Sequence, residues 1–340
     1  MSKPLKTFIK YAVSAAVTVL FLYLAFRGTD FQRLYDLIKG ANYWWMLLMF
    51  VFLMISNIFR AWRWRYLIEP IKARVSIRNL FSGVMIGYLM NNVLPRAGEV
   101  VRPYSLGKIE SIPMGAVFGT VVVERMMDMM SFLILLLILP ILYNGPLRES
   151  FPWLEQTGIV TATVIIGLLA VTTLLVLRRD FADLLLGKIL RLLPARMAGT
   201  LQRILHSFLD GFLFVRRPRN FAAIVVLSFL IWFLYVLMMY VAFHAFSLQE
   251  TIGLRAAVVV LTIATIGVAL PTPGSTGTYH FFVSASLTKL FSISDELALS
   301  YATVTHAIVF IGTTVVGLYF LLHDHIRISD AVVRPIEQPQ

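Results

Sequence analysis

The chain has 340 residues, of which 59% are hydrophobic and only 14% are charged, whereas roughly 25% of residues are charged in an average soluble protein. This composition, with a mean hydropathy of +0.80, excludes an ordinary soluble fold and indicates a multi-pass helical membrane protein. The chain contains no cysteine, which excludes disulfides, thiol catalysis, cysteine-ligated zinc and iron–sulfur clusters.

Six apolar stretches have about the length that a helix needs to cross the hydrocarbon core. In chain order they cover residues 8–26, 44–59, 114–143, 157–177, 221–246 and 297–322. The first follows three lysines, as a signal peptide does, but no small-residue cleavage site precedes Arg27, so we expect it to remain as an anchor. Four tryptophans fit a belt at the membrane interface: Trp44, Trp45, Trp62 and Trp64.

Two further apolar stretches, residues 77–94 and 254–270, are shorter and contain glycine. Each ends in Leu-Pro and continues into a polar turn with glycine. Such segments more often enter a membrane protein and turn back than cross it. The sequence therefore predicts an all-α polytopic membrane protein with six transmembrane helices and two re-entrant helical hairpins.

The basic residues support this topology. With the N-terminus inside, 23 of the 30 Lys and Arg residues lie on the cytoplasmic side, six lie on the other side and one lies within the membrane. This bias follows the positive-inside rule and places both termini in the cytoplasm. It includes the connection 178–219, whose basic amphipathic pattern predicts helices lying on the anionic leaflet. Because no basic cluster lies in a soluble domain, we expect no nucleic-acid partner.

The order of two spans, a re-entrant stretch and another span occurs twice, at an offset of about 177 residues. We assign one integral membrane domain with pseudo-repeats at residues 1–143 and 157–325 and a C-terminal tail at 326–340. The two repeats begin on opposite sides of the membrane. This pattern predicts an inverted-topology repeat, which is typical of many secondary transporters.

The first polar turn combines a helix-stopping proline, a glycine and two arginines beside a glutamate. Unpaired backbone at membrane depth is tolerated only where protein buries it or a water-filled cavity meets it, and guanidinium groups offer forked donors that suit a phosphate. We therefore expect a translocation site here. The alternative is a surface turn whose arginines pair with the glutamate or with lipid headgroups. The candidate residues are Asn92, Pro95, Arg96, Gly98, Glu99 and Arg102.

The second polar turn is rich in proline, glycine and hydroxyl residues, which make a poor helix and a good polar wall. Its backbone N–H groups could bind an anion, and its histidine could titrate near neutral pH or simply be hydrogen-bonded. The candidate residues are Pro271, Pro273, Gly274, Ser275, Gly277 and His280.

The span 114–143 carries three charged candidates, Glu124, Arg125 and Asp128. Glu124 lies about 15 Å along the helix from Met114, close to the bilayer middle. Charges at this depth are costly unless paired, and they point to function by default. An Arg125–Asp128 clamp and a translocation site are both compatible with this pattern. Arg60 either joins this polar centre or snorkels to the interface.

The motifs Asn92-x-Leu94-Pro95-x-x-Gly98-Glu99-x-x-Arg102, Glu124-Arg125-x-x-Asp128 and Pro271-x-Pro273-Gly274-x-x-Gly277 resemble those of the flippase-like transmembrane family that includes the membrane half of lysylphosphatidylglycerol synthase/flippase proteins. The resemblance covers nearly the whole chain. It implies a bacterial or archaeal cytoplasmic-membrane protein in which two re-entrant regions form a cavity for a lipid headgroup. Family members often carry a glycine at the position of Ser275 and an acid near His280. This chain departs from that pattern, so the resemblance does not imply an acid-dependent step here. It carries no aminoacyl-transfer domain, and we expect no synthase activity.

We predict a flippase or translocase that moves a polar or anionic (phospho)lipid between leaflets, with no metal, no cofactor and no catalytic motif. Two alternatives stay open. One is a non-transporting accessory subunit of an envelope-lipid or polysaccharide pathway, and the other is a membrane-embedded transferase acting on a lipid-linked substrate. The expected partners are the lipid substrate and membrane lipids, and a homo-oligomer or an envelope-pathway partner stays open.

Overall fold

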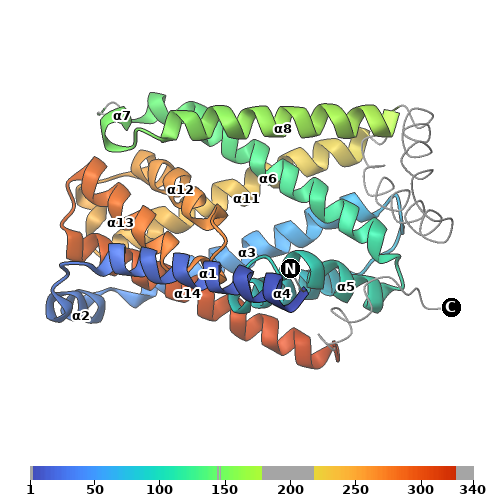
Figure 1. Cartoon of the computed structure of the whole chain (residues 1–340), viewed down its shortest axis with the longest axis horizontal. Coiled ribbons are helices and arrows are strands. Elements are labelled where there is room, and N and C mark those ends of the chain that lie inside the picture. The colour runs from blue at the N-terminus through green and yellow to red at the C-terminus, as the bar shows by residue number, and fades with distance from the viewer. Residues whose placement is uncertain (1–2, 144, 146, 178–217, 327–340) are drawn as a thin grey trace.

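The structure is a computed structural model that describes the chain except for residues 1–2, 144, 146, 178–217 and 327–340. All regular secondary structure in this described part is helical (Figure 1), which confirms the predicted all-α class. The connection 178–219 and the tail 326–340 fall almost wholly outside the described residues.

Four helices in the first part of the chain have counterparts of nearly equal length in the second part. The first series is α3 (Tyr43–Ile68), α4 (Ile77–Val93), α5 (Gly98–Glu110) and α6 (Met114–Leu142). The second series is α11 (Pro218–Ala245), α12 (Leu254–Ala269), α13 (Thr278–Phe291) and α14 (Asp295–His323). The remaining elements are α1 (Lys3–Phe26), α2 (Phe31–Gly40), α7 (Leu147–Ser150), α8 (Leu154–Leu177) and the short 3-10 turns η2 (Leu248–Glu250) and η3 (Pro273–Ser275). In both series a long helix, two short helices and a long helix follow one another.

Four helices of the described part are long and apolar enough to cross a membrane, namely α3, α6, α11 and α14. The bent pair α1–α2 makes a fifth if it counts as one span. The predicted span 157–177 coincides with α8, which is not among these five. The chain is therefore a multi-pass membrane protein, and six crossings with two re-entrant hairpins stay a prediction.

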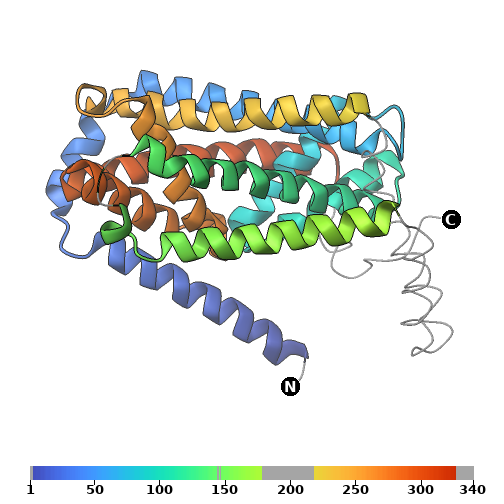
Figure 2. The same ribbon diagram turned by 90° about the horizontal axis from the view of Figure 1, so that it is seen from above.

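The N-terminal helix turns sharply before it joins the bundle. The axes of α1 and α2 differ by 87°, and Asp30 caps α2 by accepting hydrogen bonds from the backbone N–H groups of Gln32 and Arg33 at 2.9 and 3.1 Å. Figure 2 shows α1 leaving the side of the bundle toward its N-terminus. Its other half is held at α13, where the ring of Phe21 lies 5.4 Å from that of Phe281. The α2 helix therefore lies across the direction of the long helices.

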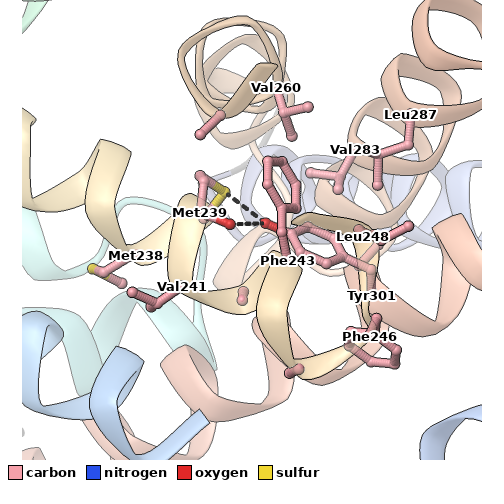
Figure 3. Packing of buried hydrophobic residues seen from close by; sticks show 14 of the residues in the cluster. Met238, Met239, Val241, Phe243, Phe246, Leu248, Val260, Val283, Leu287 and Tyr301 are labelled. Carbon is pink, nitrogen blue, oxygen red and sulfur yellow. Dashed lines mark hydrogen bonds between the residues drawn. The ribbon is translucent and has the colours of Figure 1, made fainter. Parts of the chain in front are cut away.

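The largest apolar core lies where α3 and α11 meet α12, α13 and α14. Figure 3 shows Met239 and Phe243 of α11 beside Tyr301 of α14 and Val260 of α12. Tyr301 is fully buried, and its hydroxyl donates to the Met239 carbonyl at 2.8 Å. This bond satisfies a polar group that would be costly to bury unpaired.

Helices α4 and α5 form a hairpin whose two ends are tied together. Lys72, just before α4, binds both the carboxylate and the backbone carbonyl of Glu110 at the end of α5, each at 2.7 Å. Partial burial raises the pKa of Glu110, but hydrogen bonds from Lys72 and Asn79 outweigh that effect and lower the pKa below its ordinary value. The chain therefore enters and leaves this hairpin at the same end.

The end of the second series is attached to the same hairpin. Asp324, directly after α14, pairs with Arg78 of α4 at 2.7 Å and accepts a hydrogen bond from Ser82. Partial burial raises the pKa of Asp324, and the bonds from Ser82, Arg78 and His323 lower it to a net value below the ordinary one. The two helix series are thus joined at this end of the bundle.

Glycine allows α5 to lie directly against α4. A Cβ atom at Gly98 would overlap the backbone carbonyl of Gly87, and a Cβ atom at Gly87 would lie 3.1 Å from the Cβ of Arg102. The Gly98 N–H also donates to the Asn91 side chain at 2.8 Å. Because backbone cannot move aside as a flexible side chain can, Gly98 fixes the point at which α5 begins.

We expect Gly98→Ala to lower the free energy of unfolding by about 3 kcal/mol, the upper range for overpacking, because the added methyl meets backbone. The matched control is Gly167→Ala in α8, where nothing lies within 4 Å of an added Cβ. That variant should be neutral or slightly more stable. Thermal unfolding in detergent, followed by tryptophan fluorescence, compares the two. Equal midpoints for Gly98→Ala and wild type would contradict the tight hairpin.

Candidate functional site

A network of five buried or nearly buried charges joins three helices near the middle of the bundle. Arg60 and Arg63 come from α3, Arg102 from α5, and Glu124 and Asp128 from α6. Arg60 Nη1 lies 2.5 Å from Glu124 Oε1 and 2.8 Å from Asp128 Oδ2. Arg63 Nη2 lies 2.7 Å from Asp128 Oδ1. The two Nη atoms of Arg102 bind the two oxygens of Glu124 at 2.9 and 2.7 Å.

The fourth helix of the network is α11, which supplies hydroxyl groups. Tyr235 accepts a hydrogen bond from Arg60 Nη2, and Ser228 accepts one from Arg63 Nη1, both at 2.9 Å. The network therefore crosses from the first helix series to the second. Its three guanidinium groups face two carboxylates, which leaves one positive charge in excess among these residues.

Trp64 holds Arg102 from the side opposite to Glu124. The Arg102 guanidinium carbon lies 3.8 Å from the centre of a Trp64 ring, and the indole N–H donates to Thr120 at 2.9 Å. Trp64 is fully buried, so its predicted place in the interfacial belt is wrong. Trp44 and Trp62 are exposed, as that belt requires.

The ion network changes the roles that the sequence suggests for its members. Arg60 is buried and does not snorkel to the interface. Asp128 pairs mainly with Arg60 and Arg63, whereas Arg125 Nη1 lies 3.9 Å away, so the expected Arg125–Asp128 clamp is only a weak contact. Arg102 is buried and already pairs with Glu124 through both Nη atoms, so it is not accessible to a phosphate. The positive-inside count also included Arg60, Arg63 and Arg102, which the structure buries within the protein.

Arg125 and Glu99 lie at the open edge of the network. Their side chains are about 40% exposed, and Arg125 Nε lies 3.8 Å from Glu99 Oε1. A separation of this size makes a loose pair that another ligand can displace. These two residues are the accessible charges next to the buried ones.

The first polar turn, predicted as a site, contacts the second series through Arg96 and Asn92. Arg96 is exposed, has a φ of 60°, and donates to the carbonyl of Ala269 at the end of α12 at 3.1 Å. Asn92 Nδ2 lies 2.9 to 3.1 Å from acceptors on Phe310, Thr313 and Thr314 of α14. Pro95 is buried at the start of the turn that follows α4. The two predicted turns therefore meet, although they are more than 170 residues apart.

The second turn is built on left-handed backbone. Gly274, Ser275 and Gly277 have φ values of 54°, 60° and 83°, a region that glycine adopts without strain. The exposed Pro271 accepts a hydrogen bond from Ser14 of α1 at 2.8 Å, and a Cβ at Gly277 would lie 2.7 Å from the Thr18 carbonyl. Helix α1 therefore covers this turn, and Pro273 begins the single 3-10 turn within it.

The buried His280 lies beside the partly buried His306. Its ring lies 4.6 Å from that of His306 on α14, and His306 Nε2 donates to the Gly274 carbonyl at 2.9 Å. His280 Nδ1 is buried without a hydrogen-bond partner. The pair fastens α14 to the second turn, and it lies apart from the ion network.

Sequence reasoning missed four members of these polar clusters: Arg63, Ser228, Tyr235 and His306. A signal for Arg63 was present, because Ser56, Arg60 and Arg63 recur at helical spacing and would share one face if the span continued. The structure shows that α3 does continue to Ile68, past the predicted end at residue 59. His306 carried the general signal of an ionisable residue within an apolar span. No cluster of metal-ligating residues occurs in the described part of the chain.

A comparison with known protein families matches most of the chain. The family described as "Lysylphosphatidylglycerol synthase TM region" matches residues 8–317. The chain belongs to this family. The predicted resemblance to the family that includes the membrane half of lysylphosphatidylglycerol synthase/flippase proteins is therefore confirmed.

Several curated relatives are membrane proteins of the group named UPF0104. The one from Methanocaldococcus jannaschii is 23% identical over 323 residues, covering 92% of this chain and 94% of the relative. That from Methanothermobacter thermautotrophicus is 26% identical and covers 71% of this chain and 74% of the relative. That from Pyrococcus horikoshii is 25% identical and covers 93% and 97%. No solved structure matches the chain.

Ser275 has a φ of 60°, in the left-handed region that glycine adopts without strain. A non-glycine residue in the left-handed region costs roughly 1 kcal/mol. The surrounding contacts of the second turn must therefore hold Ser275 in place.

We expect Glu124→Gln to lower the free energy of unfolding by about 3–5 kcal/mol, because it leaves three guanidinium groups facing one carboxylate in the interior. The matched control is Glu99→Gln, which removes an exposed carboxylate and should cost less than about 1 kcal/mol. Tryptophan fluorescence during thermal unfolding in detergent measures both. Equal shifts in the two variants would show that the buried network does not stabilise the fold.

Proposed function

We propose that this protein is a lipid flippase or translocase that moves a polar or anionic (phospho)lipid between the leaflets of the cytoplasmic membrane. The observation that carries the proposal is Arg125, a charged residue of the long apolar helix α6 whose side chain is 40% exposed. Arg125 lies 11 residues after the start of α6 at Met114, which is about 16 Å along the helix and close to the bilayer middle. An accessible charge at that depth is costly unless water or a polar ligand meets it.

Arg96, Glu99 and Arg125 form the proposed contact surface for the headgroup. Arg125 and Arg96 would donate to a phosphate in place of the water that the headgroup loses. Glu99, loosely paired with Arg125 at 3.8 Å, would release it when the phosphate arrives. The lipid tail would stay in the hydrocarbon, so that only the headgroup needs a polar path.

Glu124 and Asp128 act differently in this proposal. They hold Arg60, Arg63 and Arg102 in fixed positions and do not contact the headgroup. The buried network then provides a rigid positively charged wall behind the accessible arginines. The meeting of the two polar turns at Arg96 and Ala269 brings both re-entrant hairpins to the same path.

The proposed topology has six crossings, two re-entrant hairpins, an inverted repeat and both termini in the cytoplasm. The Lys72–Glu110 contact supports it for the first hairpin, because it ties the start of α4 to the end of α5. We expect cysteines introduced at Ala73 and Ser111 to react with an impermeant maleimide from the cytoplasmic side, and one at Thr251 to react from the other side. The cysteine-free chain provides the unlabelled background. Labelling of Ala73 and Ser111 from opposite sides would contradict the re-entrant hairpin, because the chain would then cross the membrane once between these two positions.

We expect Arg125→Ala and Arg96→Ala each to slow lipid movement about tenfold, because a charge-assisted hydrogen bond contributes about 1.5–3 kcal/mol. The measurement uses proteoliposomes with fluorescent phosphatidylglycerol and an impermeant quencher, which reports transfer between leaflets. Arg33→Ala, at an exposed arginine of α2, is the matched control and should behave as wild type. Unfolding midpoints of all three variants should stay near that of wild type.

The outcomes separate the alternatives. Wild-type transfer with unaffected Arg125→Ala and Arg96→Ala variants would place the path elsewhere. Wild-type protein that matches empty liposomes for anionic and zwitterionic lipids would contradict transport by the protein alone and favour an accessory subunit.

A further inference from the structure

An apolar groove lies between α2, α3 and α14, away from the polar turns. Its volume is about 400 Å³. Ile38 of α2 and Tyr43 of α3 lie at one end, and Phe50 of α3 and Gly312 of α14 lie at the other. The face of α14 from Thr303 to Gly312 forms the long wall.

The groove offers no free hydrogen bond donor from its hydroxyl groups. Tyr43 donates to the Ile38 carbonyl at 2.8 Å, and Thr303 donates to the Leu299 carbonyl at 2.7 Å. The other lining side chains are aliphatic or aromatic. A ligand held here is therefore apolar.

The dimensions of the groove fit a chain that runs along α14. From Thr303 to Gly312 the helix rises about 13 Å, close to the roughly 15 Å depth of one leaflet's hydrocarbon. A Cβ at Gly312 would lie 2.6 Å from the Phe50 ring, so α3 and α14 close the groove at its inner end. Ile311 is 59% exposed, so the groove stays open sideways toward lipid.

The charge at the outer end of the groove indicates a headgroup. Helix α2 lies across the bundle direction at 87° to α1, buries Leu34 and exposes Arg33 and Lys39. An amphipathic helix in this orientation lies in the membrane interface. Lys39 is exposed and follows the groove-lining Ile38 directly in the sequence, which makes it the cation of α2 nearest in sequence to the groove, while Asp36 lies two residues before Ile38.

We propose that this groove is a binding site for one acyl chain of an anionic phospholipid in the leaflet next to α2, with the lipid phosphate near Lys39. The contact of Gly312 with the Phe50 ring closes the groove at its inner end. The bound lipid is thus a resident of one leaflet. This site does not depend on the proposed function, since it requires no transfer between leaflets.

The test uses proteoliposomes that contain phosphatidylglycerol with a photoactivatable diazirine in one acyl chain, followed by peptide mapping by mass spectrometry. We expect adducts to concentrate on the α3 and α14 segments around Phe50 and Ile311. Ala307→Phe, whose ring fills the groove, should reduce these adducts to the level of other lipid-exposed faces. Val315→Phe, at a 61% exposed position of α14 outside the groove, is the matched control and should keep them.

Two further arms keep the result decisive if Ala307→Phe folds poorly. In wild type, added unlabelled phosphatidylglycerol should compete for the groove in a saturable way. The adducts on exposed faces should fall only in proportion to the dilution of the photoactivatable lipid. Lys39→Gln should reduce the preference for phosphatidylglycerol over phosphatidylcholine at the groove.

The proposal would be overturned if the adducts were spread evenly over exposed helices such as α11 and did not change in Ala307→Phe. That result would mean that the label reports only the lipid that surrounds the protein. The proposal would also be overturned if the groove stayed unlabelled while the wild type was dimeric and Ala307→Phe was monomeric. That result would mean that a second copy of the chain occupies the groove. Labelling at the groove in protein that fails the transfer assay would uphold this site and count only against the proposed function.

Discussion

The bidentate bond between Arg102 and Glu124 is the constraint on which much of the structure depends. Glu124 lies at membrane depth with no exposed surface, and such a carboxylate is stable only if cations reach it. Arg102 reaches it from α5, which must fold back along α4. That return requires glycine at position 98, where a Cβ would overlap the backbone carbonyl of Gly87, and it leaves little room at Gly87, where a Cβ would lie 3.1 Å from the Arg102 side chain. The buried charge of Glu124 in α6 thus constrains the backbone path of the α4–α5 hairpin that precedes it.

Polar contacts also join the two helix series. Arg60 and Arg63 bind hydroxyl groups of α11, Asn92 binds α14, and Arg96 binds the end of α12. Between helices in lipid the hydrophobic effect contributes little, so packing and interhelical hydrogen bonds carry the association. The buried arginines and Asn92 therefore hold the two series together, next to the accessible charges of Glu99 and Arg125.

The sequence predicted the helices and the meeting of the two turns better than it predicted the partners of each charge. Apolar length and the Leu-Pro stops identify the short helices, because a proline disfavours helical backbone at the residue before it. Proline is not a stop everywhere in this chain, since Pro103 and Pro140 lie inside α5 and α6. Arg63 and Trp64 were misplaced because hydropathy ends a span at its first charges, although the helix continues wherever another helix neutralises them. Arg102 appeared free for a similar reason. Its partner Glu124 lies on a different helix, and one segment alone does not reveal that pairing.

The uneven charge of the buried network bears on which headgroup the open edge would accept. Three guanidinium groups face two carboxylates in an interior where charges are weakly screened. Arg125 adds a further positive charge at the edge, and Glu99 balances only one of these from 3.8 Å. A cationic headgroup approaching Arg125 would meet a net positive wall, whereas an anionic one would be attracted by both the exposed and the buried arginines. The selectivity for negative charge would therefore come largely from residues that the headgroup never touches, with the exposed arginines supplying the direct contacts.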